Sequence, residues 1–121
     1  MDRAMLERER ACYRAALEEA VERIRERFAA LPGVQRVSLF GSYARGRRDL
    51  LTDLDVLVVM RTEEPFPERL KRLHRLAEAG VDLDILCYTP EEFARMKTRP
   101  FLRHALKDEV VLYEKPARGG S

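Results

Sequence analysis

The stretch from Asp53 to Met60 constrains the fold of this chain more than any other part of the sequence. Apart from Asp53 and Asp55, every residue in it is apolar. A strand that is apolar on both faces has to lie inside a sheet that is covered on both sides. The 121 residues are enough for one hydrophobic core and too few for two ordinary domains. We therefore expect residues 1–121 to form a single domain around this strand.

A long amphipathic helix is expected near the N-terminus. Between residues 6 and 30, apolar side chains recur at spacings of three and four, with Glu and Arg between them. This periodicity is typical of a helix with one apolar face. Pro32 and Gly33 follow directly and are expected to end the helix.

Shorter helices and strands alternate along the rest of the chain. The pattern predicts strands at residues 34–40, 81–88 and 109–114, the last at a sheet edge, and helices at residues 68–79, 90–98 and 101–107. Gly80 is expected to end the first of these helices, and Thr89 with Glu92 has the spacing of a capping box for the second. This order predicts an α/β (α+β) fold, a small mixed β-sheet covered by helices. The core would span residues 34–114, followed by a disordered tail at 116–121.

Composition and charge exclude several classes of protein. The formal net charge of +2 is too small for a surface that coats nucleic acid. No apolar run approaches the ~20 residues of a membrane span, and the N-terminus shows no signal region, so we expect a cytoplasmic protein. Cys12 and Cys87 are then expected as reduced, half-buried thiols. His74 and His104 are close to neither cysteine, which argues against a zinc site.

Two pairs of acids stand at the heads of predicted strands. Asp53 and Asp55 are two residues apart, so along a strand their side chains share one side, about 6.6 Å apart. Two carboxylates at this spacing can converge on one Mg²⁺ ion, which fills its shell with phosphate oxygens and water. Asp82 and Asp84 share a face by the same rule. If the two strands are neighbours, one of these two acids would complete the cluster.

A small-residue turn follows the strand at 34–40. A glycine, Gly41, lets the backbone approach a phosphate closely, and Ser42 adds a hydroxyl beside the free N–H groups of a helix start. Arg45, one turn further on, would add a charge-assisted contact to a phosphate. The turn and the acid pairs together predict a site for a phosphate group and a divalent cation.

In this order, Phe40-Gly41-Ser42-Tyr43-Ala44-Arg45-Gly46 and Thr52-Asp53-Leu54-Asp55-Val56-Leu57-Val58 resemble the signature of the nucleotidyltransferase superfamily that includes DNA polymerase beta. The similarity is greatest to the stand-alone minimal nucleotidyltransferases of bacteria and archaea. It covers residues 31–114 and implies the palm-like fold of that superfamily.

The resemblance also implies roles for single residues. Gly41 and Ser42 would hold the β- and γ-phosphates, while Asp53, Asp55 and Asp84 would be the catalytic carboxylates and the ligands of a two-metal Mg²⁺ site. Asp82 competes with Asp84 for the third position. The reaction implied is Mg²⁺-dependent transfer of a nucleoside monophosphate, AMP from ATP, to an acceptor hydroxyl.

The acceptor is the open question. The chain has no second domain of the kind that binds the acceptor in larger members of the superfamily, and a protein or a nucleic acid would each satisfy the chemistry. Minimal nucleotidyltransferases are often paired with a small helical HEPN protein in toxin–antitoxin systems. The resemblance therefore implies an alternative function, an antitoxin that adenylylates such a partner or simply binds it.

Overall fold

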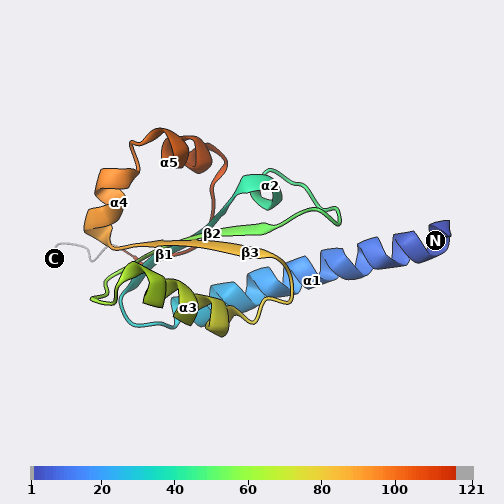
Figure 1. Ribbon diagram of the computed structural model, residues 1–121, viewed down its shortest axis with the longest axis horizontal. Helices are drawn as coiled ribbons and strands as arrows, with labels where there is room; N and C mark the ends of the chain where they lie inside the picture. The colour runs from blue at the N-terminus through green and yellow to red at the C-terminus, as the bar shows by residue number, and fades with distance from the viewer. Residues whose placement is uncertain (1, 117–121) are drawn as a thin grey trace.

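The structure, a computed structural model, describes residues 2–116 and is organised around one mixed four-stranded sheet (Figure 1). The strand order is β3-β2-β1-β4. Strand β1 runs antiparallel to both β2 and β4, whereas β2 and β3 are parallel. The strands are β1 (Val34–Phe40), β2 (Leu54–Met60), β3 (Leu83–Tyr88) and β4 (Val110–Glu114). The mixed sheet, the central place of β2 and the edge position of β4 are confirmed.

Two helices cover one face of the sheet, α1 (Arg3–Ala29) and α3 (Phe66–Ala77) (Figure 1). Alternate residues of the strands point toward these helices, so the main core forms here. It contains the apolar side of α1 (Leu17, Ala20, Val21, Ile24 and Phe28) and, from β2, Leu54, Val56, Val58 and Met60. The predicted helix at residues 6–30 is confirmed, although it begins three residues earlier.

The opposite face of the sheet is covered more thinly. It carries α4 (Pro90–Met96), α5 (Pro100–Ala105) and a turn of 3₁₀-helix (Leu106–Asp108). A small second core of Phe40, Leu57 and Ala105 lies under them. Because residues alternate along a strand, Asp55 projects to the same side of β2 as Leu57. The thin cover therefore leaves room for a site on this face.

The end of α3 differs from the expectation. The helix stops at Ala77, and Glu78 takes the left-handed conformation (φ 41°) that Gly80 was expected to provide. Two arginines of α1 explain the early stop, because they bind the last carbonyl groups of α3. Arg23 donates to the carbonyl oxygen of Glu78 at 2.8 Å, and Arg27 donates to that of Leu76 at 2.9 Å.

The capping box at the start of α4 is confirmed and is joined by a buried arginine. Thr89 and Glu92 exchange the two expected hydrogen bonds, at 2.8 and 3.2 Å. Arg69 of α3, which is 6% exposed, donates to Glu92 at 2.6 Å and to the carbonyl oxygen of Glu64 at 2.7 Å. Hydrogen bonds from Arg69 and then Thr89 lower the pKa of Glu92.

We expect Arg69→Met to lower the free energy of unfolding by about 2 kcal/mol, because it leaves the Glu92 carboxylate without its buried partner. Urea titrations at pH 7 measure this change. A lowered native pKa stabilises the fold above the unfolded pKa of Glu, so the difference should shrink as the pH falls below about 4. The control is Arg72→Met on the same helix, whose exposed pair with Glu64 should contribute less than about 1 kcal/mol. Equal losses in the two variants would contradict this account.

The two cysteines are both free, as expected, but neither is half-buried. Cys12 lies exposed on α1, whereas Cys87 is fully buried in β3. Burial raises the pKa of the Cys87 thiol to about 11. We therefore expect a thiol reagent at pH 8 to modify Cys12 of the native protein quickly and Cys87 only after denaturation. Mass spectrometry of the modified peptides checks this, and rapid labelling of Cys87 would contradict it.

The predicted tail at 116–121 lies outside the described residues, except for Pro116. Within residues 2–116, no helix combines the length and the apolar character that crossing a lipid bilayer requires. His74 and His104 are both exposed on helices.

Candidate active site

The sheet brings Asp55 and Asp84 side by side. They are register partners in the parallel pair of β2 and β3, so their backbones lie one strand spacing apart, about 4.8 Å. Asp53 immediately precedes β2, two residues before Asp55. The two acid-bearing strands are therefore neighbours, and three carboxylates belong to one end of this strand pair.

The electrostatics of Asp55 reflect this crowding. Its pKa is raised, first by burial and then by the negative charges of Asp84 and Asp53, while Arg45 acts in the opposite direction. A carboxylate in such a position is stabilised by a cation. The arrangement is therefore costly without a positive ligand.

Asp82, the competitor for the third position, lies beside the start of β2 but is not the register partner of Asp55. It precedes β3, and its carbonyl oxygen accepts a hydrogen bond from the N–H of Leu54 at 3.0 Å. Its charge acts on Tyr13 of α1, raising the pKa of that phenol after burial itself, and not on Asp55. This placement favours Asp84 as the third member of the cluster.

The glycine turn meets Asp55 directly. Gly41 begins the four-residue helix α2 (Gly41–Ala44) with φ 74°, next to Phe40, the register partner of Asp55. A Cβ atom added to Gly41 would overlap Oδ2 of Asp55 and lie 3.0 Å from its Cγ. Only glycine therefore fits between the turn and the carboxylate. The start of α2, with its unpaired N–H groups, is held against the acidic cluster.

Arg45 lies at the end of α2 and remains exposed. Its guanidinium is 3.8 Å from the carboxylate of Asp108, and its charge is felt by Asp55. A long exposed cation near three carboxylates is free to turn toward a phosphate. This is consistent with the expected phosphate contact.

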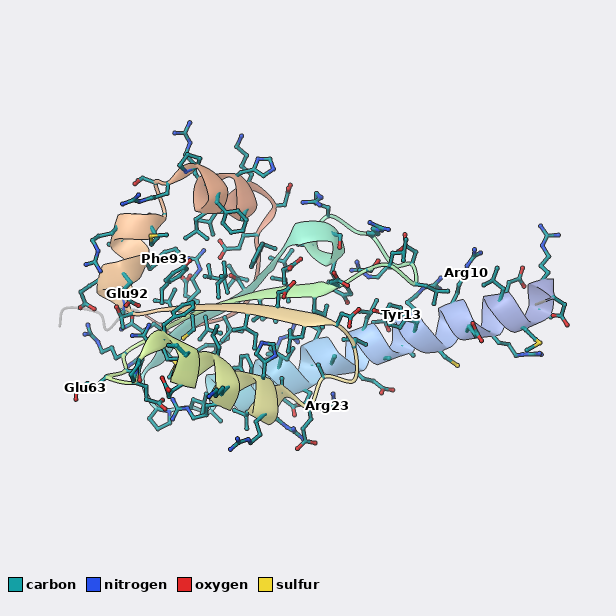
Figure 2. The ribbon with its side chains drawn as sticks, in the orientation of Figure 1. Arg10, Tyr13, Arg23, Glu63, Glu92 and Phe93 are labelled. Carbon is teal, nitrogen blue, oxygen red and sulfur yellow. The ribbon has the colours of Figure 1, made fainter. Side chains whose placement is uncertain are left out.

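The loop that carries Asp53 is fixed by contacts that the sequence did not indicate. Thr52 is fully buried and exchanges hydrogen bonds with Asp49 at 3.0 and 3.1 Å, so the loop is folded on itself. The hydroxyl of Tyr13 donates to the carbonyl oxygen of Thr52 at 2.7 Å (Figure 2). The first half of α1 thus braces the residue immediately before Asp53. Only the spacing of Tyr13 on the apolar side of α1 could have hinted at this contact.

Arg48 has a structural position rather than one in the site. Its guanidinium donates to the carbonyl oxygen of Tyr43 at 2.7 Å and stacks on the Tyr43 ring at 3.4 Å from the centroid. The stack holds the C-terminal end of α2 and points the Tyr43 ring toward the main core.

Among residues 2–116, no three acidic, histidine or cysteine side chains form a ready-made metal cage. The donor set nevertheless suits Mg²⁺, because this ion commonly takes one or two carboxylates and completes its shell with phosphate and water oxygens. The mutual repulsion that raises the pKa of Asp55 also fits a cation site. The residues present therefore match an ion that arrives with its nucleotide.

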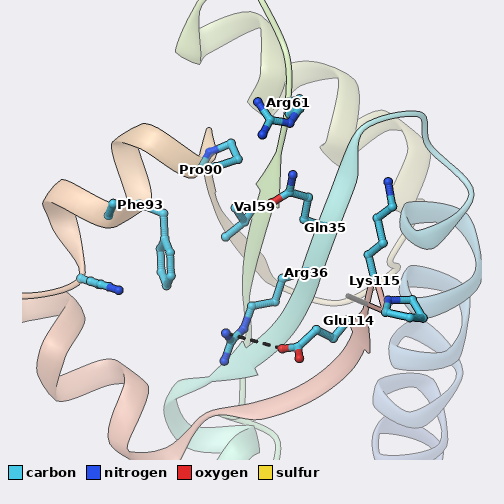
Figure 3. A pocket seen from close by; sticks show the side chains of 11 residues that line it. Gln35, Arg36, Val59, Arg61, Pro90, Phe93, Glu114 and Lys115 are labelled. Atoms are coloured by element: carbon cyan, nitrogen blue, oxygen red, sulfur yellow. Dashed lines mark ion pairs between the residues drawn. The ribbon is translucent and has the colours of Figure 1, made fainter. Parts of the chain in front are cut away.

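A cavity of about 630 Å³ lies away from these acids, at the other end of the strands (Figure 3). Its lining includes Arg36, Val59, Phe93 and Lys97. Val59 is four residues beyond Asp55 on β2, about 13 Å along the strand. This cavity is thus separate from the acidic cluster.

Known proteins with similar sequences or folds were compared with this chain. A protein of Methanocaldococcus jannaschii, provisionally named a protein adenylyltransferase, is 30% identical over 80 residues, 65% of this chain and 78% of that relative. A crystal structure from Sulfolobus solfataricus, provisionally described as a nucleotidyltransferase, is 22% identical and covers 88% of this chain and 84% of its own, with a TM-score of 0.54.

A further structure with the same fold contains the MNT antitoxin with the tri-AMPylated HEPN toxin of Shewanella oneidensis. The matched chain is 19% identical, with a TM-score of 0.56 over 82% of this chain and 73% of that one. At these identities the two structures establish the fold alone, and they confirm the small mixed sheet of the nucleotidyltransferase fold.

The family is established by sequence. The family model described as nucleotidyltransferase domain matches residues 18–81, more than half of the chain. The match includes Gly41, Ser42, Asp53 and Asp55 and ends before Asp84. This chain therefore belongs to the nucleotidyltransferase domain family and is an enzyme of that class.

Proposed function

We propose that this enzyme transfers AMP from ATP to a hydroxyl group of a protein, with Mg²⁺ held by Asp53, Asp55 and Asp84. The single observation that carries the proposal is the position of Asp55. It lies between a register partner, Asp84, and the glycine turn at Gly41, where the phosphates of a nucleotide would meet the carboxylates.

In this proposal the turn binds the leaving part of the nucleotide. The N–H groups at the start of α2 and the hydroxyl of Ser42 donate to the β- and γ-phosphates, and Arg45 adds a charge-assisted contact. Gly41 allows the phosphates to approach the carboxylate because it has no side chain. Binding there aligns the α-phosphate with Asp53 and Asp55.

The transfer forms a bond between the acceptor oxygen and the α-phosphorus and breaks the bond from that phosphorus to pyrophosphate. Divalent cations at the three carboxylates would activate the attacking oxygen and stabilise the departing pyrophosphate. Asp84 is the most exposed of the three carboxylates, so it is best placed to accept the proton of the acceptor hydroxyl. No further side chain is required, because positioning and charge neutralisation supply most of the catalysis.

The choice of an adenylyl group, and hence of ATP, and of a protein acceptor rests on the relative from Methanocaldococcus jannaschii, which is provisionally named a protein adenylyltransferase. The AMPylated toxin in the Shewanella complex, which shares only the fold, points the same way. The small formal net charge of +2 also favours a protein over a nucleic acid as the acceptor.

The test uses two samples of ATP, one labelled at the α-phosphate and one at the γ-phosphate. Each is incubated with the enzyme, MgCl₂ and a soluble extract of the source cells. Nucleotidyl transfer should move label from the α position to an acceptor and none from the γ position. Transfer should stop in EDTA and in Asp53→Ala. Label transfer from the γ position, or transfer unchanged in Asp53→Ala, would overturn the proposal. Parallel reactions with α-labelled GTP, CTP and UTP check the base.

The fold shared with the MNT antitoxin supports a second candidate, an antitoxin for a HEPN protein. It would act either by adenylylating that protein or by forming a complex with it. Co-purification with a HEPN protein encoded beside this chain tests this candidate, and the Asp53→Ala variant separates its two modes. Neutralisation of the toxin that survives in Asp53→Ala indicates complex formation, whereas its loss indicates adenylylation.

A further inference from the structure

The first half of α1 contacts the rest of the protein mainly through Tyr13. Residues 3–16 include no buried side chain, and the first buried residue of the helix is Leu17. Figure 1 shows this segment, here called the α1 overhang, extending beyond the sheet. It is about 21 Å long. A helical segment of this length gains little stability without packing, so the overhang is suited to being covered.

Exposed apolar side chains gather at the overhang. Met5 is 46% exposed, and Leu50 and Leu51, in the loop before Asp53, are 41% and 76% exposed. A shallow groove of about 500 Å³, here called the α1 groove, lies between the helix and this loop. It is lined by one basic and one acidic residue, Arg8 and Glu9, and otherwise by Met5, Cys12, Tyr13, Ala16 and Leu50. Met5 of the helix and Leu50 of the loop thus face the same hollow.

The α1 groove adjoins the acidic cluster. Tyr13 lines the groove and donates its hydroxyl to the carbonyl oxygen of Thr52, the residue before Asp53. Leu50, two residues before Thr52, belongs to the same loop and lines the groove. A macromolecule seated in the groove would therefore contact the loop that leads to Asp53.

The net charge of the α1 overhang favours an acidic binding partner. Arg3, Arg8, Arg10 and Arg14 outnumber Glu7 and Glu9, which gives the segment a net charge of +2 (4 − 2). Pairing of two overhangs would bring like charges together. An amphipathic helix with acidic residues beside its apolar face is complementary both to the groove and to the arginines.

We propose that the α1 groove is the docking site for the acceptor protein, which presents an amphipathic, acidic helix to it. This inference rests on the proposed function and adds a place where the acceptor binds. Docking there would hold a hydroxyl of the acceptor near Asp53 while the nucleotide occupies the turn at Gly41. The protein would then select its acceptor through α1.

The test compares labelling of proteins in the source-cell extract by the wild type, Met5→Asp and the double variant Leu50→Asp/Leu51→Asp, with α-labelled ATP and Mg²⁺. Val111→Asp, on the edge strand β4 and 44% exposed, is the matched control. The groove variants should label protein at least about tenfold more slowly, because a docking contact is lost. Binding of Mg-ATP, measured by calorimetry, should equal that of the wild type. Circular dichroism melts confirm that all variants fold.

The outcomes separate the two proposals. If the wild type labels no protein, the proposed function fails and takes this inference with it. If the wild type labels protein and the groove variants do so as fast as Val111→Asp, only the docking site is overturned. Label found on nucleic acid after protease treatment also overturns it. So does self-association in sedimentation that Met5→Asp abolishes, because a second copy would then occupy the groove.

Discussion

Replacing Asp55 with Asn should abolish AMP transfer and, at the same time, make the metal-free protein more stable. We expect activity to fall at least about 10³-fold, because a neutral amide neither holds a cation nor neutralises it at the reacting phosphate. Stability should rise because Asp55 is partly buried beside Asp84 and Asp53, which raise its pKa. In EDTA at pH 7 we expect the Tm to increase by about 3 °C.

The pH dependence of this gain follows from the direction of the shift. A native pKa above the unfolded one means that ionisation of Asp55 destabilises the fold as the pH rises through that range. Asp55→Asn removes this loss. The gain in Tm should therefore be present at pH 7 and disappear as the pH falls below the ordinary Asp pKa of 3.8.

With excess Mg-ATP the wild type should have the higher Tm and Asp55→Asn the lower one. The wild type gains stability from the bound nucleotide and cation, and the variant gains little. Thermal melts in EDTA and in Mg-ATP measure, on one preparation of each protein, the Tm without ligand and the increase in Tm on binding. A variant that is less stable than the wild type in EDTA, or that keeps a tenth of the activity, would contradict the assignment of Asp55.

The second large effect is expected for Gly41→Ala. The added Cβ would overlap Oδ2 of Asp55, and the φ of 74° is itself strained for alanine. The turn must then move away from β2, which separates the phosphate-binding N–H groups from the carboxylates. We expect transfer to fall at least about 100-fold, because misplacement by about 1 Å is enough for such a loss.

Gly80→Ala is the matched control for this variant. Gly80 has a similar φ of 68°, but a Cβ there would meet no atom within 4 Å. Both variants carry the backbone strain, about 1–2 kcal/mol, which urea titrations measure. Only Gly41→Ala should also lose activity. Comparable activities in the two variants would show that contact with Asp55 is unimportant.

Local patterns were sufficient to predict most of the fold. The apolar body of β2, the spacing of apolar residues in α1 and the capping box at Thr89 depend on neighbours in sequence, and each was found as expected. The end of α3 was predicted wrongly because arginines from α1 bind its last carbonyl groups. Contacts between residues about 50 apart leave no mark on a local pattern.

The same distinction applies to the candidate site. The spacing of Asp53 and Asp55 and the glycine turn could be predicted, since each lies within a short segment. The pairing of Asp55 with Asp84 required knowing which strands are neighbours and in what register. The hydrogen bond from Tyr13 to Thr52 joins positions 39 residues apart, and the sequence could not indicate it.

We expect metal ions and a triphosphate to meet between the three carboxylates and the glycine turn. Crystals grown with Mn²⁺ and a non-hydrolysable ATP analogue would locate the ions by anomalous scattering. We predict manganese bound by Asp53, Asp55 and Asp84, with the triphosphate against Gly41 and Ser42. Manganese bound away from these carboxylates, or the triphosphate in the separate cavity beside Arg36 and Lys97, would contradict the account.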